Sequence, residues 1–166
     1  MIGNWQSLEK PTHEQFVELA ESYRQAAMDF CNRMTQHEGQ QTWPNACVVL
    51  MLSAHAVEIF LKGAILSREP NAQFETNHRL DKLGEWYSRL FPDQPFESPF
   101  QSDYSNIPEA KIDTLRKQEP VPSIFFRYPV QRDGTDWPGF HAFEPASFFE
   151  ILNTLGSDFE RIRQHL

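Results

Sequence analysis

Two stretches of the chain, one near each end, carry apolar residues at alternating steps of three and four positions. The first predicts a helix that begins at Thr12, where Thr12 and Gln15 have the spacing of a capping box, and runs to about His37. The second predicts a helix that begins near Pro145 and continues through Leu166. The two helices should pack together through their apolar stripes, which are Phe16, Ala20, Tyr23, Ala27, Phe30 and Met34 in the first and Phe148, Leu152, Leu155, Phe159, Ile162 and Leu166 in the last.

A third stretch, residues 42–68, is apolar on almost every side of a helix. Thr42 is expected to cap it, Pro44 falls in its first turn, where the missing N–H is harmless, and Pro70 follows its end. A helix that is apolar all round lies at the centre of its bundle. We therefore predict that the first and last helices pack around this one.

Three polar side chains interrupt this apolar helix. At roughly 100° per residue, His55, Glu58 and Lys62 fall within about 60° of one another on one face, while Ser53 points elsewhere. Buried polar groups need partners, so this polar stripe (His55, Glu58 and Lys62) is a candidate site. The same groups would each cost a few kcal/mol in the middle of a membrane span, so we expect a core helix and no membrane.

Two shorter helices are predicted in the middle of the chain. Asn77 should cap a third helix that ends at Phe91-Pro92, and residues 93–106, rich in Pro, Ser and Asp, form a loop. A short fourth helix is expected over about 108–118. The inward residues should be Leu80, Leu83, Tyr87 and Leu90 in the third helix and Ile112 and Leu115 in the fourth.

The pattern changes over residues 121–143, where prolines interrupt the chain. Residues 124–126 favour extended backbone and Asp133-Gly134 indicates a turn, so we predict an irregular flap or a short hairpin. The predicted fold is an all-α antiparallel bundle of four to five helices with this insertion, in one domain spanning residues 1–166. The aromatic residues of the insertion should cover the bundle: Phe125, Phe126, Tyr128, Trp137, Phe140 and Phe143.

Composition limits the possible partners. The formal net charge of −8 argues against nucleic-acid binding through the overall field, so any site for a polyanion must be local. Cys31 and Cys47 lie in apolar helical patterns and are expected to be free, reduced and buried. No metal-ligand spacing or phosphate-binding glycine loop occurs, so no metal or cofactor is predicted. Residues 1–10 do not resemble a secretory signal, which favours a cytoplasmic location.

Two motifs in order carry a family resemblance. The helix with Ser53-x-His-x-x-Glu-x-x-Leu-Lys62, followed by a linker and Asn77-His78-Arg79-Leu80 at the next helix, resembles the HEPN superfamily of small helical bundles. Such proteins often carry Glu and Leu-Lys on an Ala-rich helix and then a His-x-Leu. Many stand-alone members also have an Arg-Tyr-Pro turn, here Arg127-Tyr128-Pro129. The resemblance is best over residues 42–90.

The resemblance implies a homodimer with a groove between protomers. Many HEPN proteins are metal-independent ribonucleases, or partners of nucleotidyltransferases, in toxin–antitoxin, defence or RNA-processing systems. The ribonucleases place an arginine before the histidine, with about four to six residues between the two. In this chain those positions hold Asn71, Ala72 and Gln73, and the nearest upstream arginine is Arg68. The resemblance therefore points to a HEPN-like domain that lacks the arginine of the ribonuclease motif.

Three functions remain open on this basis. The leading hypothesis is a non-catalytic or degenerate binding module for a nucleotide, RNA or a partner protein in a defence, stress or toxin–antitoxin setting. The first alternative is a ribonuclease in which His78 moves the proton and a cation holds the charge that develops on the phosphate. The second is a purely structural dimer. The candidate catalytic residue is His78, Arg79 or Arg127 is the candidate cation, and the groove residues are His55, Glu58, Lys62, Arg79, Arg127 and Tyr128.

Each of these residues also has a structural interpretation. Glu58 and Lys62 can form a simple i, i+4 ion pair, and His78 can bond a neighbouring carboxylate. Arg127 can stack on an aromatic ring and fork onto Glu58, and His55 can be a core or interface histidine. The deciding observation is whether these side chains converge on an open cavity, which favours function, or form a sealed network, which favours a scaffold.

Overall fold

The computed structural model describes residues 4, 9–74, 78–100, 107–118, 120–137 and 142–166. Within these residues the chain is helical and contains no β-strand. Five helices have ten or more residues, and a 3₁₀ turn (η2, Glu38–Gln40) and one short helix complete the described elements. The predicted all-α bundle of four to five helices is therefore confirmed.

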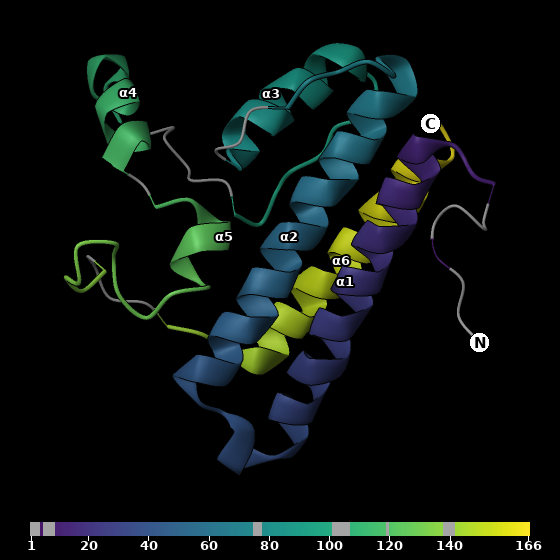
Figure 1. Cartoon of the computed structure of the whole chain (residues 1–166). Helices are drawn as coiled ribbons and strands as arrows, with labels where there is room; N and C mark the ends of the chain where they lie inside the picture. Colours follow the sequence, from purple (N-terminus) through teal and green to yellow (C-terminus); the bar gives the residue numbers. More distant parts are fainter. Residues whose placement is uncertain (1–3, 5–8, 75–77, 101–106, 119, 138–141) are drawn as a thin grey trace.

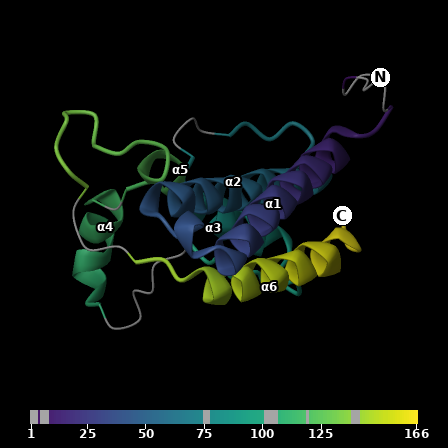
Figure 2. The ribbon, with the colours of Figure 1, turned by 90° about the horizontal axis from the view of Figure 1, so that it is seen from below.

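Three long helices, α1 (Thr12–Gln36), α2 (Trp43–Arg68) and α6 (Pro145–Arg163), form the centre of the molecule. Helices α1 and α2 lie side by side in opposite directions, and α6 packs against both, antiparallel to α1 (Figure 1 and Figure 2). The first and last helices therefore pack together as predicted. All the predicted apolar residues of α6 from Phe148 to Ile162 are buried.

Helix α2 is the core helix that its sequence predicts. Thr42 caps it, because the Thr42 side chain accepts a hydrogen bond from the backbone N–H of Asn45, and Pro44 lies in the first turn. The buried Ser53 hydroxyl donates to the carbonyl of Val49 at 2.7 Å, so it needs no other partner. By length and composition α2 could cross a membrane, but most of its apolar window is buried inside the bundle.

Helix α1 differs from its prediction in two details. Pro11, not Thr12, precedes the helix, and the Gln15 side chain donates to the carbonyl of Lys10, so the predicted capping box is absent. At three positions the residue after the predicted one is buried in its place, so the buried face of the helix is rotated. Phe16, Tyr23 and Phe30 are therefore only partly buried. The buried residues of α1 are Val17, Ala20, Arg24, Ala27, Cys31 and Met34.

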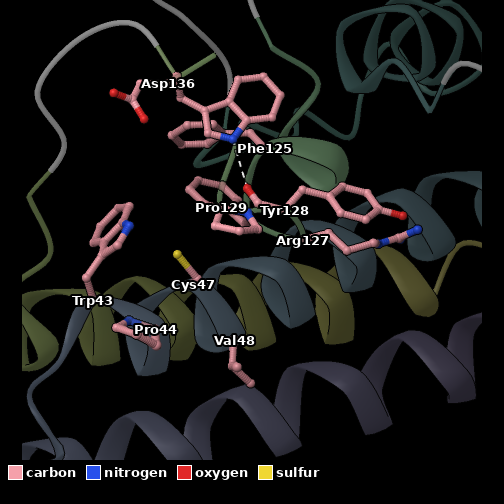
Figure 3. A pocket seen from close by; sticks show the side chains of 11 residues that line it. Trp43, Pro44, Cys47, Val48, Phe125, Arg127, Tyr128, Pro129 and Asp136 are labelled. Atoms are coloured by element: carbon pink, nitrogen blue, oxygen red, sulfur yellow. Dashed lines mark hydrogen bonds between the residues drawn. The ribbon is translucent and has the colours of Figure 1, made fainter. Parts of the chain in front are cut away.

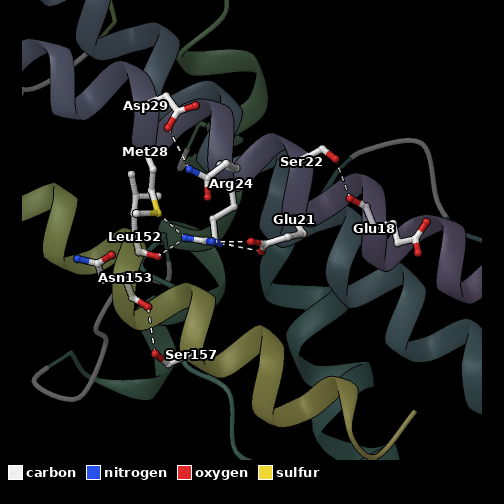
Figure 4. A network of polar contacts seen from close by, with 10 residues as sticks. Glu18, Glu21, Ser22, Arg24, Met28, Asp29, Leu152, Asn153 and Ser157 are labelled. Carbon is white, nitrogen blue, oxygen red and sulfur yellow. Dashed lines mark hydrogen bonds and ion pairs between the residues drawn. The ribbon is translucent and has the colours of Figure 1, made fainter. Parts of the chain in front are cut away.

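The rotation of α1 places a charged side chain, Arg24, between α1 and α6. Arg24 is 8% exposed, and its Nη1 donates to the carbonyl of Leu152 at 3.1 Å and contacts the sulfur of Met28 (Figure 4). Its Nε and Nη2 donate to the carboxylate of Glu21 at 2.8 and 2.5 Å. Gly156 of α6 leaves room for the guanidinium, since an added Cβ there would lie 2.8 Å from Cζ of Arg24.

Helix α3 (Leu80–Leu90) packs against α2 and ends before Pro92, as predicted. The proposed cap Asn77 lies outside the described residues. Arg79 occupies the position before the helix, and its side chain makes no capping hydrogen bond. The predicted inward residues of α3 are buried, apart from Leu90, which is half-buried.

Helix α4 (Glu109–Gln118) is present where the sequence predicts it, but it stands away from the bundle (Figure 1). Ile112 and Leu115 are half-buried and are not part of the core, so their predicted inward packing is only partial. The hydrophobic core of the described residues is therefore formed without residues of α4.

The insertion at 121–143 contains a helical turn where extended backbone was predicted. Helix α5 (Pro122–Phe125) begins at a proline, whose fixed φ suits the first helical position. The N–H groups of Ile124 and Phe125 both bond the carbonyl of Val121 at 2.9 Å. Helix α5 packs against α2, so this local geometry carries the aromatic residues to the core helix.

The rest of the insertion follows the prediction in part. The predicted turn is present at Gly134, where φ is +84°, and the described residues form no hairpin strands. Phe125 is buried and Phe126 and Phe143 pack partly against the core, but Tyr128 is 54% exposed, contrary to prediction. Phe140 lies outside the described residues.

Candidate functional site

The polar stripe of α2 is buried at its centre. Glu58 is 2% exposed and lies about one helical turn from His55 and from Lys62. Its Oε1 accepts a hydrogen bond from Lys62 Nζ at 2.6 Å, and its Oε2 lies 3.8 Å from His55 Nδ1. The common face that the spacing predicts for these three side chains is therefore present.

His78 joins the stripe from outside α2. Its Nδ1 lies 2.7 Å from Glu58 Oε1, so the carboxylate connects α2 to the segment that leads into α3. His78 was expected in the first turn of the third helix, but it precedes that helix, and its φ of +53° is in the left-handed region. Glu58 therefore bonds His78, and not Arg127 as one interpretation of the sequence proposed.

The ionisation of Glu58 fixes the tautomer of His78. Burial is the largest single effect on the pKa of Glu58 and raises it, but contacts with His55, Lys62 and His78 together outweigh burial and lower the pKa to about 2. An ionised carboxylate only accepts hydrogen bonds, so Nδ1 of His78 carries the hydrogen. In the neutral ring, Nε2 of His78 is then the acceptor.

The two histidines lie near different oxygens of the Glu58 carboxylate, His55 near Oε2 and His78 near Oε1. The ring of His55 packs edge-on against Tyr23 of α1, with ring centroids 4.7 Å apart. Its Nδ1 and the Oε2 of Glu58 are buried and have no hydrogen-bond partner among the described residues. His55 thus belongs to the α1 side of the stripe, and only His78 and Lys62 reach the α3 side.

A cavity of about 340 Å³ opens beside His78, between the C-terminal part of α2 and α3. We call it the His78 cavity. Five of its ten lining residues are basic, counting His78, and one is acidic. The lining residues are Lys62, Gln73, Phe74, His78, Arg79, Lys82, Leu83, Glu85, Trp86 and Arg89.

The basic residues in α3 and directly before it differ in how firmly they are paired. Arg79 forks onto Asp81, with N···O distances of 2.9 and 2.7 Å, and Lys82 lies 3.3 Å from Glu85. Arg89 is exposed and has no hydrogen bond or ion pair within the described part of the chain. Arg89 is therefore the cation of this cavity that is most available to a ligand.

Two aromatic rings form a wall of the His78 cavity. Phe74 and Trp86 lie with their centroids 5.7 Å apart, and Lys62 Nζ lies 5.5 Å from the centroid of Phe74. The indole N–H of Trp86 donates to Glu69 Oε2 at 3.1 Å, which fixes the orientation of that ring. The cavity thus combines cations with aromatic surface.

Arg127 and Tyr128 lie at a different cavity, at the N-terminal part of α2 (Figure 3). We call this space, of about 580 Å³, the Trp43 cavity. The structure therefore brings His55, Glu58, Lys62, His78 and Arg79 together and separates Arg127 and Tyr128 from them. The lining of the Trp43 cavity is Trp43, Pro44, Cys47, Val48, Phe125, Phe126, Arg127, Tyr128, Pro129, Asp136 and Trp137.

Sequence reasoning did not select Phe74, Lys82, Trp86 or Arg89 as site residues. A signal for three of them was available, because Lys82, Trp86 and Arg89 recur at steps of four and three on the face of α3 that carries no buried leucine. Cys47 is a free cysteine as expected, but it is partly exposed at the Trp43 cavity and not buried.

Within the described residues, no three His, Cys, Asp or Glu side chains gather in a way that could hold a metal ion.

Comparisons of the chain with protein-family models, with curated proteins and with solved structures gave no match. The functional argument therefore depends on the geometry of the two cavities.

Proposed function

We propose that this chain is a non-catalytic binding module that takes a nucleotide, free or within single-stranded RNA, in the His78 cavity. The observation that carries the proposal is the cluster of five basic side chains beside two aromatic rings, with His78 held by the buried Glu58. The proposal also includes a HEPN-like helical bundle as the fold of the chain and the cytoplasm as its location.

The chemistry of the cavity suits a nucleotide better than other anions. Cations recognise phosphate, and aromatic faces stack on a base regardless of its identity. Trp86 is fixed by its hydrogen bond to Glu69, and Arg89 offers a guanidinium fork that matches phosphate oxygens. In a chain of net charge −8, such a local group of cations needs a specific reason.

Ribonuclease activity is the second candidate, and the Glu58–His78 pair is the observation that favours it. A carboxylate that accepts a hydrogen bond from Nδ1 leaves the other ring nitrogen, Nε2, to act as a base, as in the carboxylate–histidine pairs of hydrolytic enzymes. Neither arginine named from the sequence fits as its partner, because Arg79 is bound to Asp81 and Arg127 lines the other cavity. Binding without cleavage is therefore the function that this geometry supports best.

The HEPN resemblance adds the expectation of a homodimer, and a defence, stress or toxin–antitoxin setting. A dimer would bring two His78 cavities into one particle, which suits a longer RNA better than a single nucleotide. Size-exclusion chromatography with light scattering tests this part separately from binding.

The binding test uses a fluorescent single-stranded RNA oligonucleotide, with ATP as a competing mononucleotide. We expect Arg89→Ala to weaken RNA binding about tenfold and to reduce the slope of log affinity against log salt by about 0.7. The matched control is Arg163→Ala, which removes one exposed arginine in the last turn of α6 that is not among the residues lining the cavity. Equal affinities for wild type and Arg89→Ala would contradict the proposal.

Cleavage is measured in the same samples in the presence of EDTA. The binding module should leave the oligonucleotide intact over a long incubation. If the wild type cuts RNA and His78→Ala does not, the ribonuclease candidate replaces the binding module. If ATP displaces the RNA fully, the mononucleotide and the RNA occupy the same site.

A further inference from the structure

The Trp43 cavity is a second possible ligand site, and the proposed function does not use it. It lies between the first turns of α2 and the segment 125–137, and its volume of about 580 Å³ is typical of small-molecule sites. Trp43, Pro44, Cys47 and Val48 supply the helix side. The other side comes from residues far along the chain, so the cavity depends on how the insertion folds.

The aromatic wall of this cavity is fixed by contacts within the insertion. The indole N–H of Trp137 donates to the carbonyl of Tyr128 at 2.8 Å (Figure 3). The same indole meets the buried Phe125 edge to face, with ring centroids 5.2 Å apart and an angle of 87°. These contacts within the chain fix the wall, while Trp43 opposite is 41% exposed.

One carboxylate, that of Asp136, faces the same space. Figure 3 shows the Asp136 carboxylate on the side of the cavity where Trp43 stands, across from the thiol of Cys47. Within the described residues the Asp136 side chain makes no hydrogen bond or ion pair. Arg127, the other charged lining residue, extends away from Asp136 along α2 (Figure 3). Burial raises the pKa of Cys47, so its thiol adds no negative charge at neutral pH.

We propose that the Trp43 cavity binds a small organic cation with apolar substituents, such as a quaternary or methylated ammonium group. The negative faces of aromatic rings attract such cations, and the methyl groups lose less hydration on entering an aromatic pocket than a bare ammonium does. Asp136 adds charge complementarity from the rim. An anion of the same size would meet that carboxylate and the electron-rich ring faces.

Calorimetric titration with choline and with 3,3-dimethylbutan-1-ol tests the charge directly. The two molecules have nearly the same shape, and only choline carries a positive charge. We expect choline to bind about tenfold more tightly than the neutral alcohol. Equal affinities, or binding of the alcohol alone, would overturn the cation proposal.

Two variants locate the binding. Trp43→Leu should weaken choline binding about tenfold, and Asp136→Asn about threefold, because an exposed carboxylate contributes less than a ring face at contact distance. Asp93→Asn removes an exposed carboxylate elsewhere and should leave the affinity unchanged. Melting temperatures identify any variant that has lost its fold. If folded Trp43→Leu and Asp136→Asn both bind choline like wild type, the proposed site is wrong.

Discussion

Arg24 and Glu58 are both charged and buried, and they lie on neighbouring helices, yet their surroundings differ. Arg24 directs all three of its side-chain nitrogens to other protein groups at the contact between α1 and α6 (Figure 4). Glu58 positions Lys62 and His78, and both of these line an open cavity. A surface hollow also borders Arg24 and Met28, but the side-chain nitrogens of Arg24 are bound within the chain. A buried charge therefore indicates a site only where its partners can still bind a ligand.

Removing Arg24 should cause the largest loss of folding stability and should leave the affinity for the ligand unchanged. Arg24→Ala deletes a long side chain from the α1–α6 contact, together with its hydrogen bond to Leu152, and should lower the free energy of unfolding by about 3 kcal/mol. Urea denaturation measures the loss. The folded variant should bind RNA with the same affinity as wild type. If it keeps its stability but loses RNA binding, Arg24 is not purely structural and does not differ from Glu58 in the proposed way.

Glu58→Gln should change both stability and binding. The amide keeps the shape but not the charge, so we expect a loss of about 2 kcal/mol of unfolding free energy and weaker RNA binding, because His78 and Lys62 lose the carboxylate that positions them. The affinity is measured with the same labelled oligonucleotide. An unchanged affinity would show that Glu58 has only a structural role.

The pH dependence of the Glu58→Gln effect follows from the lowered pKa of Glu58. That pKa is about 2 in the folded protein, against an ordinary value of 4.5, so ionised Glu58 stabilises the fold above about pH 4.5. The contribution is lost as the pH falls from about 4.5 toward 2. The stability difference between wild type and Glu58→Gln should therefore shrink over that window, as measured by urea denaturation at each pH. A constant difference would mean that ionisation of Glu58 does not stabilise the fold.

A pair of glycines gives the smallest and most selective test. Gly156→Ala places a Cβ 2.8 Å from the guanidinium of Arg24 and should lower stability by about 1 kcal/mol, despite the better helix propensity of alanine. Gly84→Ala on α3 meets nothing within 4 Å and should raise stability by up to about 1 kcal/mol. Melting temperatures should move in opposite directions. A rise in both would show that Arg24 has space to move.

The helical framework could be predicted from the sequence because it depends on local patterns. Thr42, Pro44 and the continuous apolar run define α2, and the polar stripe follows from the spacing of three residues. The exact face of α1 could not be predicted in this way. Arg24 counts as polar in any periodicity, yet it is buried because Gly156 and the carbonyl of Leu152 are placed to receive it.

The composition of the site depended on contacts that sequence spacing does not define. Contact between Glu58 and the segment before α3 was one of several possibilities, and the assignment of His78 as its partner needed the crossing of α2 and α3. Arg127 was a candidate cation for His78, and the sequence left open whether the two lie close together; α5 packs on α2 nearer its N-terminal end and carries Arg127 with it. Interactions between distant segments thus decided which residues share a cavity.

The backbone at His78 restricts which residues could replace it. With φ at +53°, β-branched or bulky residues are strongly disfavoured at this position, whereas glycine, asparagine, aspartate and histidine tolerate it. Of these four, glycine has no side chain to bond Glu58 and aspartate would place a second negative charge beside it. Asparagine can donate to the carboxylate but has no second ring nitrogen to offer to a ligand. Conformation and chemistry together therefore favour histidine, so relatives of this chain that keep Glu58 should vary little at this position.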